Sequence, residues 1–472
     1  MYFKFKNCNI IEFYEGNRFR AGGCIPCENG YKVNSEKTGC ELQHLIINQT
    51  ACGDNHTMFL TSEGKVYGCG WNNYYQINST NTVTIMGNRI KPPTEISDYP
   101  QLLSNEYITK IACGASHTMF LTNLGKVYGC GTNHFNQVNS KKEQCRTGYI
   151  CVKIPTEITD FPASVEITQI ACGTAHTMFL SSEGNVYGCG RNQNHQVNST
   201  KELNSGNDNY SVQKPKKITD FDPQLETGDK INQIACGDYY TMFLTKEGKV
   251  YGCGLNQYYQ INSSNDDIIT RPTKITDFDP QLETGDKINQ IACGDYYTMF
   301  LTKEGKVYIC GNKNIYEIYS TREIYSTREQ SPKCDYCVQK PTQITNFYPE
   351  LLSGDKITKI ACGRGHTMFL TEQGKVYGYG KNEYHQVNSS NDDKITRPTK
   401  ITDFDPQLET GDKITKIACG REHTTFTTSK GKVYGCGINN YNQNGERNGE
   451  TVKISNSIIA VVKNKKLIDI PI

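Results

Sequence analysis

One motif, repeated seven times, constrains the fold of this chain more than any other feature. Residues 51–70 read ACGDNHTMFLTSEGKVYGCG, and the Ala-Cys-Gly triplet returns at Ala112, Ala171, Ala235, Ala292, Ala361 and Ala418. Consecutive copies begin 61, 59, 64, 57, 69 and 57 residues apart. A unit repeated at a nearly fixed period predicts a repeat architecture, in which similar units stack on one another.

Each copy contains four short segments with the composition of β-strands. Ile-x-x-Ile-Ala-Cys-Gly predicts the first strand, residues 56–61 (HTMFLT) predict the second, and Lys-Val-Tyr-Gly-Cys-Gly predicts the third. Pro-Thr-x-Ile-Thr predicts a short fourth strand, with its proline at the start of an outer edge strand. A glycine between the second and third strands fits a hairpin residue with positive φ in every copy: Gly64, Gly125, Gly184, Gly248, Gly305, Gly374 and Gly431.

The second strand is apolar on both of its faces, because Phe59 stands between Met58 and Leu60. A sheet buried on both faces is expected where each sheet lies between two neighbours, as in a propeller. The seven copies therefore predict an all-β, seven-bladed β-propeller of four-stranded antiparallel blades over residues 42–472. A short Cys-rich N-terminal segment, residues 1–41, stands outside the repeat.

These motifs resemble the regulator of chromosome condensation repeat family. The family pattern corresponds here to Gly53, His56, Leu60, Thr61, Gly64, Val66, Tyr67, Gly70 and Asn72, and the match covers about residues 42–456. The resemblance implies a seven-bladed propeller. It also assigns a structural role to Gly53, His56, Gly64, Gly70, Gly114, His117, Gly173, His176, Gly237, Gly294, Gly363, His366, Gly420 and His423.

The chain departs from the family pattern at three positions. Cys69 and its equivalents replace a tryptophan, except in copy six, where Tyr379 does. Tyr240 and Tyr297 replace the strand histidine in copies four and five. The family's Gly-Gln-Leu-Gly becomes Gln76-Ile77-Asn78, and we expect Asn78 to take the left-handed conformation in place of glycine.

Histidines and cysteines recur in the repeat, so a metal or catalytic ring and a set of disulfides are both conceivable. The tyrosines of copies four and five break any symmetric metal site, which favours a histidine hydrogen-bonded inside each blade. Cysteines 17 residues apart, such as Cys52 and Cys69, fall on the first and third strands. Two strand spacings are too far for a disulfide, so we expect buried free thiols.

The N-terminal segment carries a separate cluster of Cys8, Cys24, Cys27 and Cys40. Four thiolates at this spacing permit a zinc site, and two disulfides would stabilise a segment too short for its own core. The Gly-Tyr after the Cys-x-x-Cys resembles small extracellular cysteine-rich modules of the growth-factor-receptor type. The interpretations of disulfide module, zinc site and free thiols stay open.

Composition excludes several classes of protein. A net charge of +2 argues against a strongly basic nucleic-acid face, and there is no apolar run long enough for a spanning helix. The first residues lack the apolar core of a secretory signal, so we expect a cytoplasmic protein, with a nuclear location as an alternative. An extracellular location would require a signal peptide missing from this sequence. No motif for catalysis or for a cofactor is present, and we expect neither.

Antiparallel strands place the first–second and third–fourth connections on one face of a propeller. The opposite face receives the second–third turns and the links between blades, where DFDPQLETGDK occurs three times and predicts an acidic surface. Variable loops on a rigid scaffold commonly carry binding residues, and tyrosine and arginine are common anchors. The candidates are Tyr74, Tyr75, His134, Phe135, Arg191, His195, Tyr258, Tyr259, Tyr384, His385 and Tyr441.

The sequence thus predicts a non-enzymatic platform that binds a protein partner through its long-loop face. The family resemblance implies an alternative, nucleotide exchange on a Ran-type small GTPase, for which the factor needs no bond chemistry of its own. A second alternative is a secreted or surface protein with a disulfide-rich N-terminal module. The sequence leaves the oligomeric state open.

Overall fold

The computed structural model describes residues 46–79, 89–97, 102–140, 143–145, 148–200, 210–312, 337–444 and 451–455, with the backbone of five short strands before residue 46. The chain divides into two compact units, residues 47–462 and residues 1–46 with 463–472. In the second unit, β1 (Tyr2–Lys4), β2 (Ile11–Glu15) and β3 (Arg18–Arg20) form one antiparallel sheet, and β4 (Tyr31–Val33) pairs with β5 (Cys40–Leu42).

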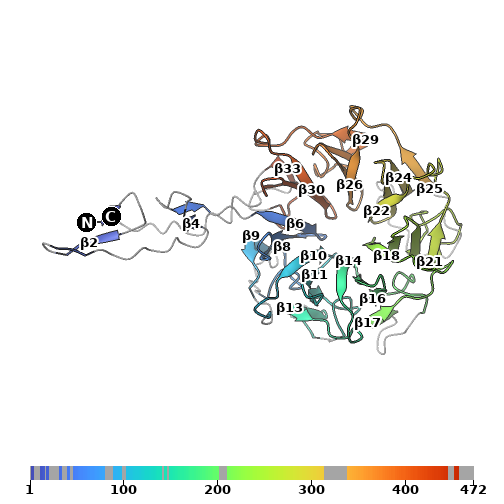
Figure 1. Ribbon diagram of the computed structural model, residues 1–472, viewed down its shortest axis with the longest axis horizontal. Helices are drawn as coiled ribbons and strands as arrows, with labels where there is room; N and C mark the ends of the chain where they lie inside the picture. The colour runs from blue at the N-terminus through green and yellow to red at the C-terminus, as the bar shows by residue number, and fades with distance from the viewer. Residues whose placement is uncertain are drawn as a thin grey trace. The chain divides into compact units, whose positions relative to one another are not determined.

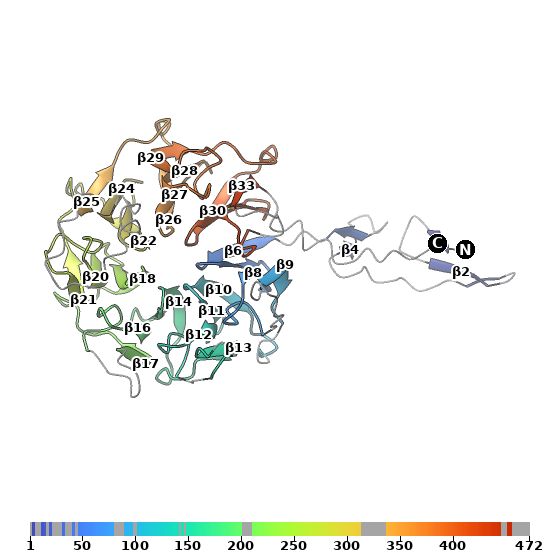
Figure 2. The same ribbon diagram turned by 180° about the vertical axis from the view of Figure 1, so that it is seen from behind.

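Residues 47–462 form seven four-stranded antiparallel sheets, the blades, arranged in a ring around a central axis (Figure 1). Each blade uses four consecutive strands, ordered from the axis to the rim, and Figure 2 shows the same order from behind. This all-β ring confirms the predicted seven-bladed propeller.

The strand bounds repeat closely from blade to blade. The innermost strands are β6 (Ile47–Cys52), β10 (Ile108–Cys113), β14 (Ile167–Cys172), β18 (Ile231–Cys236), β22 (Ile288–Cys293), β26 (Ile357–Cys362) and β30 (Ile414–Cys419). The second strands are β7 (His56–Thr61), β11 (His117–Thr122), β15 (His176–Ser181), β19 (Tyr240–Thr245), β23 (Tyr297–Thr302), β27 (His366–Thr371) and β31 (His423–Thr428). The third strands are β8 (Val66–Trp71), β12 (Val127–Thr132), β16 (Val186–Arg191), β20 (Val250–Leu255), β24 (Val307–Asn312), β28 (Val376–Lys381) and β32 (Val433–Ile438). The outermost strands are β9 (Arg89–Glu95), β13 (Cys151–Glu157), β17 (Ser211–Lys217), β21 (Ile268–Ile275), β25 (Cys337–Ile344), β29 (Lys394–Lys400) and β33 (Thr451–Ser455).

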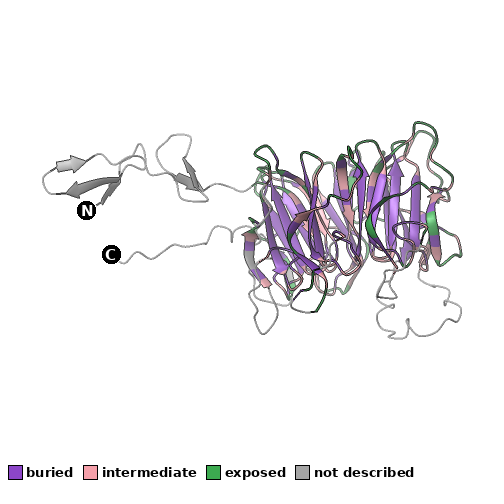
Figure 3. Ribbon diagram, turned by 90° about the horizontal axis from the view of Figure 1, so that it is seen from below, coloured by how far each residue is buried: buried purple, intermediate pink, exposed green. Residues whose placement is uncertain are grey.

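The hydrophobic core lies between the blades. Every residue of each second strand is buried, as the purple strands of Figure 3 show. Met58 and Leu60 of blade one pack with Phe120 and Tyr128 of blade two, and the pattern recurs around the ring. Each blade is therefore stabilised mainly by the apolar area it buries against its neighbours.

Two glycine positions are fixed by backbone geometry. Gly64 has a φ of 80°, and its six equivalents are also positive, which confirms the predicted hairpin. Gly70 has a φ of 108°, and an added Cβ would lie 2.4 Å from the carbonyl oxygen of Asn55. A side chain at this position is therefore excluded by both strain and space.

The prediction that the prolines start the outer strands was wrong. Pro155 lies within β13, in a bulge where three residues of β13 lie opposite one residue of β12, between the pairs Gly129–Thr156 and Gly131–Val152. The same register shift occurs in blade three at Pro215. A bulge on an edge strand tolerates a residue without an N–H, so the strand continues through the proline instead of beginning there.

A belt of buried hydrogen bonds joins the blades. His56 Nε2 lies 3.0 Å from Thr118 Oγ1 of the next blade, and that hydroxyl donates to the carbonyl oxygen of Gln76 at 2.6 Å. Tyr240 takes the histidine position in blade four, and its hydroxyl donates to the carbonyl oxygen of Tyr297 at 2.5 Å. The other histidine contacts are His117–Thr177, His176–Thr241, His366–Thr424 and His423–Thr57.

This belt corrects the prediction of a histidine bonded inside its own blade. The imidazole lies against the glycine that ends the innermost strand, since an added Cβ on Gly53 would be 2.2 Å from His56 Cε1. From there its Nε2 reaches across to the neighbouring blade. Burial lowers the pKa of all five imidazoles to about 3, so they are neutral at physiological pH.

The cysteines of the first and third strands are free thiols, as predicted. Cys52 is partly buried and Cys69 is fully buried, and neither is bridged. A separate disulfide joins Cys145, in the connection between β12 and β13, to Cys151, the first residue of β13, with the two Cα atoms 5.8 Å apart.

Candidate partner-binding face

One face of the propeller gathers the turns between first and second strands and the connections between third and fourth strands. We call it the long-loop face, and the opposite face, with the second–third turns and the blade links, the link face. The two kinds of connection meet in each blade, since the Trp71 N–H donates to the carbonyl oxygen of Asn55 at 2.8 Å. Thr132 and Ser116 repeat this bond in blade two.

A side-chain clasp gives the long-loop connections a defined shape. Asn72 Oδ1 accepts the N–H of Ile77 at 2.9 Å, and its Nδ2 donates to Asn78 Oδ1 at 2.9 Å. Gln76 Oε1 accepts the N–H of Tyr74 at 3.0 Å. The same asparagine position forms equivalent bonds at Asn133, Asn192, Asn256 and Asn382.

The clasp also corrects the expected place of the left-handed residue. Tyr75, not Asn78, has a positive φ of 62°, because Asn78 is held by Asn72 and the turn reverses three residues earlier. The equivalents include two asparagines and three bulky residues: Asn136, Asn442, His195, Tyr259 and His385. Such a conformation costs a bulky residue about 1–2 kcal/mol, so the clasp maintains local strain on this face.

The structure spreads the predicted binding residues around the face in contacts between neighbouring blades. The Arg191 guanidinium lies between the rings of Phe135 and Tyr239, 5.2 and 5.1 Å from their centroids. Tyr258 contacts Tyr296 of the next blade at 5.0 Å. These side chains are half-buried, so part of each faces solvent.

Most of the other predicted binding residues also contact aromatic or charged side chains on the long-loop face. Tyr441 contacts Trp71 at 4.4 Å across the junction of blades seven and one. Tyr384 lies near the Lys381 ammonium, and Tyr74 packs against Tyr149 at 5.3 Å. His134 contacts Phe135, and His195 and His385 are half-buried at the strained position. Tyr75 differs, because it is buried against Cys145 and Cys151.

Sequence reasoning missed several residues of this face. Trp71, Tyr239 and Tyr296 complete the aromatic pairs, and Arg89 lies over Tyr441 at 5.1 Å. Tyr239 and Tyr296 directly precede second strands. Only the assembled ring places their side chains beside the long loops of the preceding blade. Their identity as tyrosine in the two duplicated copies was the available signal.

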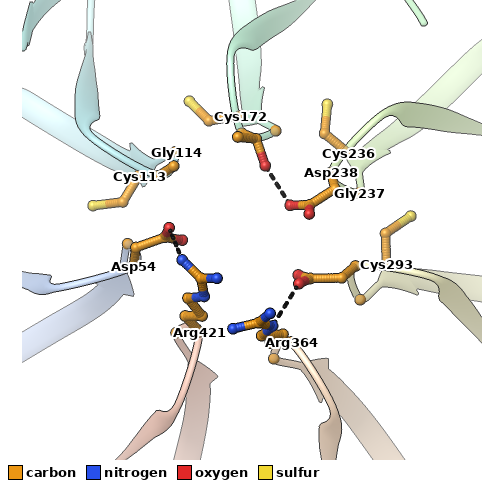
Figure 4. A pocket seen from close by; sticks show the side chains of 18 of the residues that line it. Asp54, Cys113, Gly114, Cys172, Cys236, Gly237, Asp238, Cys293, Arg364 and Arg421 are labelled. Atoms are coloured by element: carbon orange, nitrogen blue, oxygen red, sulfur yellow. Dashed lines mark hydrogen bonds and ion pairs between the residues drawn. The ribbon is translucent and has the colours of Figure 1, made fainter. Parts of the chain in front are cut away.

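A cavity of about 130 Å³ lies on the axis, where the first–second turns of all seven blades converge (Figure 4). The Arg421 guanidinium is 3.1 Å from Asp54, the Arg364 guanidinium is 3.3 Å from Asp295, and Asp238 accepts a hydrogen bond from Thr174. The residue after the Ala-Cys-Gly triplet supplies this ring, and it varies between copies while the triplet does not. That variation was a usable signal that the sequence reasoning passed over.

Burial controls the protonation of the cavity's groups. It raises the pKa of Asp238 to about 6, against the opposing hydrogen bond from Thr174. Burial also raises the pKa of Asp54 and Asp295, which nearby arginines oppose. The thiols of Cys113, Cys172, Cys236 and Cys293 point away from the centre in Figure 4. Burial raises the pKa of Cys172 to about 12, so this thiol is not a nucleophile at neutral pH.

The link face is less acidic than its loop sequence predicts. Asp222 pairs with Arg271 at 2.6 Å, and Asp279 pairs with Lys340 at 3.0 Å, in both cases on the outermost strand. Glu226 pairs with Lys249 of the hairpin at 2.6 Å. The prediction weighed the four acids of each link against the one lysine within it, and left out the bases of the strands and hairpins that pair with these acids.

The N-terminal cysteine cluster cannot be placed in a site. Cys8, Cys24 and Cys27 lie outside the described residues, and only the backbone of Cys40 is described, at the start of β5. Among the residues that the structure does describe, no group of three or more His, Cys, Asp or Glu is arranged to hold a metal ion. That same part of the chain contains no helix long and apolar enough to cross a membrane.

Family models match most of the chain. The RCC1-like domain model covers residues 25–323, and models of the regulator of chromosome condensation (RCC1) repeat match 357–386, 414–443 and 373–427. The chain belongs to the RCC1-like domain family. This membership agrees with the seven blades observed and confirms the family resemblance of the repeat motifs.

The chain is similar in sequence to proteins that are named for different activities. The chain is 26% identical over 410 residues to human E3 ubiquitin-protein ligase HERC2, which covers 85% of the chain but only 7% of that protein. It is 28% identical to the ultraviolet-B receptor UVR8 of Arabidopsis thaliana, covering 73% of the chain and 67% of the receptor. It is 24% identical to the guanine nucleotide exchange factor SRM1 of Saccharomyces cerevisiae, covering 71% of the chain and 64% of that factor.

Solved structures share the fold. Human WBSCR16 matches with a TM-score of 0.63 and 20% identity, covering 91% of this chain and 98% of that one. Prp20p of Saccharomyces cerevisiae matches with a TM-score of 0.59 and 22% identity, covering 82% and 85%. At this identity the likeness extends to the fold of the RCC1-like ring and not to its partners.

Proposed function

We propose that this RCC1-like propeller is a non-enzymatic interaction platform that binds a protein partner through its long-loop face. The observation that carries the proposal is the set of half-buried aromatic and arginine side chains that meet between blades there, such as Arg191 between Phe135 and Tyr239. Tyrosine, tryptophan and arginine dominate the binding energy of protein interfaces. Packed against a neighbouring blade, they lose little conformational entropy when a partner arrives.

Two further features support this face over the other. The clasped loops hold non-glycine residues such as Tyr259 and His385 at positive φ, a strain typical of positions kept for function. The link face offers charges that are already paired, for example Asp222 with Arg271, and exposed pairs of this kind contribute little to binding.

The test compares two triple variants with matched composition. Arg191→Ala, Tyr258→Ala and Tyr384→Ala remove one arginine and two tyrosines from the long-loop face. Arg397→Ala, Tyr107→Ala and Tyr348→Ala remove the same residue types from the link face and rim, where both tyrosines are 53% exposed.

The tagged wild-type protein and both variants are used to capture partners from lysate, with quantitative mass spectrometry as the readout. We expect a set of proteins enriched by the wild type to be lost with the long-loop variant and retained with its control. Equal capture by all three folded proteins, or loss with the control alone, would contradict the proposal. Unfolding midpoints of the three proteins check that each is folded.

Guanine-nucleotide exchange on a Ran-type small GTPase is the second candidate. It is favoured by the relative SRM1, which is named a guanine nucleotide exchange factor, and by Prp20p, whose structure is described with its binding to Gsp1p and histones. Release of labelled GDP from a Ran-type GTPase, with and without this protein, tests the candidate. Acceleration of 100-fold or more would make the GTPase the partner of the long-loop face, and no acceleration would leave a platform for another protein.

A further inference from the structure

The innermost strand of each blade has one edge that faces the axis and has no strand partner. At four of the seven blade interfaces, a glutamine of the preceding blade satisfies this edge. Gln49 accepts the N–H of Ile111 at 3.0 Å and donates to its carbonyl oxygen at 2.9 Å. Gln233–Ile291 and Gln290–Ile360 form the same two bonds, and Gln169 accepts the N–H of Ile234 at 3.1 Å.

Lysine replaces this glutamine at the other three interfaces: Lys110, Lys359 and Lys416. The Lys359 ammonium donates to the carbonyl oxygen of Thr415 at 2.7 Å, and the Lys416 ammonium donates to the carbonyl oxygen of Asn48 and to Asn48 Oδ1, the latter at 2.7 Å. Lysine has donors but no acceptor, so it cannot receive the backbone N–H that glutamine receives. The N–H groups of Ile417 and Thr50 therefore lack the side-chain acceptor found at the glutamine interfaces.

Two of these lysines are neighbours. Lys359 in β26 and Lys416 in β30 occupy adjacent blades, and β30 in turn lies next to β6 of blade one, as the ring in Figure 1 shows. No carboxylate of the described residues forms an ion pair with either ammonium, although ion pairs are abundant elsewhere in these blades. Partial desolvation lowers the pKa of both ammonium groups, and the charge of Lys359 adds to the effect at Lys416.

The site is open to solvent. Lys359 is exposed and Lys416 is half-exposed. The glutamine-bridged isoleucines, such as Ile111 and Ile291, are only 2% exposed, whereas Ile417 is partly exposed. Two positive charges thus lie at a partly solvent-accessible edge, where they donate to neutral oxygens of Thr415 and Asn48 and have no described carboxylate to balance them.

We propose that the inner edges of blades six, seven and one bind a phosphate-class oxyanion, held by the ammonium groups of Lys359 and Lys416 and by the N–H groups of Ile417 and Thr50. A tetrahedral oxyanion offers acceptors in several directions, and lysine binds phosphate as a point charge. The anion would offset the repulsion between the two lysines and take the place of the glutamine bridges where the last blade meets the first. This inference is independent of the partner-binding proposal.

The test measures the thermal unfolding midpoint of the full chain against inorganic phosphate, with sodium chloride holding the ionic strength constant. A ligand that binds the folded state raises the midpoint, and we expect a rise of roughly 2–4 °C near saturation. Equilibrium dialysis with radiolabelled phosphate should give one site per chain.

The matched variant is Lys359→Gln with Lys416→Gln, which installs the glutamine bridge already used at four interfaces and so preserves the fold. We expect it to lose both the phosphate-dependent rise and the bound phosphate. Lys110→Gln, at the isolated lysine, should keep both. A wild-type midpoint that phosphate does not raise above chloride, or a double variant that still binds phosphate, would overturn the proposal.

Discussion

His423 Nε2 lies 2.9 Å from Thr57 Oγ1, across the junction where blade seven meets blade one. The two residues are 366 positions apart, and the Thr57 hydroxyl also donates to the carbonyl oxygen of Gln443 at 2.8 Å. None of the strands that the structure describes crosses this junction, because β6–β9 form blade one and β30–β33 form blade seven. The ring is therefore closed by side-chain packing and by polar contacts such as this pair and the Arg421–Asp54 ion pair.

Thr57→Val should destabilise the ring at its junction. Valine keeps the shape of threonine but leaves the buried His423 imidazole and the Gln443 carbonyl without their partner, at a cost of about 2–3 kcal/mol. Urea unfolding should show a lower midpoint. Thr57→Ser, which keeps the hydroxyl, should lose about 1 kcal/mol or less, and equal losses in the two variants would argue against a role for the hydrogen bonds.

The five buried histidines should make stability fall with acidity. Burial lowers each folded pKa to about 3, whereas an unfolded histidine titrates near about 6.5. Between these values only the unfolded chain binds the proton. Their contribution is thus complete above pH 6.5 and is lost as pH falls toward 3, by up to about 1.4 kcal/mol per pH unit for each histidine.

His423→Tyr tests this account with a side chain that the protein already uses at Tyr240 and Tyr297. Tyrosine does not titrate in this range. The number of protons taken up on unfolding, given by the slope of unfolding free energy against pH between pH 4 and 6, should therefore fall by about one. The variant should remain folded at pH 7, because the hydroxyl can reach a carbonyl of the next blade as Tyr240 does. An unchanged slope would show that His423 is not buried in its neutral form.

Gly53→Ala should disrupt the packing of the histidine belt. The added Cβ would lie 2.2 Å from His56 Cε1 and 2.6 Å from the carbonyl oxygen of Gly114, and His56 is fixed by Thr118. We expect a loss of about 2 kcal/mol or more in unfolding free energy. Gly228→Ala is the control, because no atom lies within 4 Å and only its positive φ is strained, for about 1 kcal/mol.

Tyr259→Asn separates stability from binding on the long-loop face. Asparagine already occupies the equivalent positive-φ positions at Asn136 and Asn442, so the change should relieve strain and leave stability equal or higher by up to about 1 kcal/mol. Capture of the partner should fall because an interface tyrosine is lost. Lower stability combined with unchanged capture would show that Tyr259 serves packing alone.

The sequence was sufficient for the local structure of each repeat. The second strand was predicted at residues 56–61 and is found at His56–Thr61, because its period, its apolar faces and the following glycine are all local signals. The predictions for the prolines and for Asn78 were wrong because both depended on the backbone register, which the hydrophobic pattern does not determine. A bulge and an asparagine clasp shift the backbone register without changing the hydrophobic pattern.

Contacts between copies were less accessible to sequence reasoning. The pairs His56–Thr118 and Arg421–Asp54 depend on which residues face each other after the ring closes, and residues in the second pair are 367 positions apart. The variable position after Ala-Cys-Gly marked the axial ring, but only the geometry of the turns shows that the seven positions converge. The roles of Gln49 and Lys416 likewise emerge from the neighbouring blade and not from their own.

The most direct test of the central claim is hydrogen–deuterium exchange of the propeller with and without its captured partner. Partner binding through the long-loop face should protect the connections after the third strands, including residues 72–78 and 256–262, and the turns at 53–55 and 237–239. The blade links at 218–230 and 275–287 should exchange as in the free protein. Protection confined to those links, with the long-loop connections unchanged, would contradict the account.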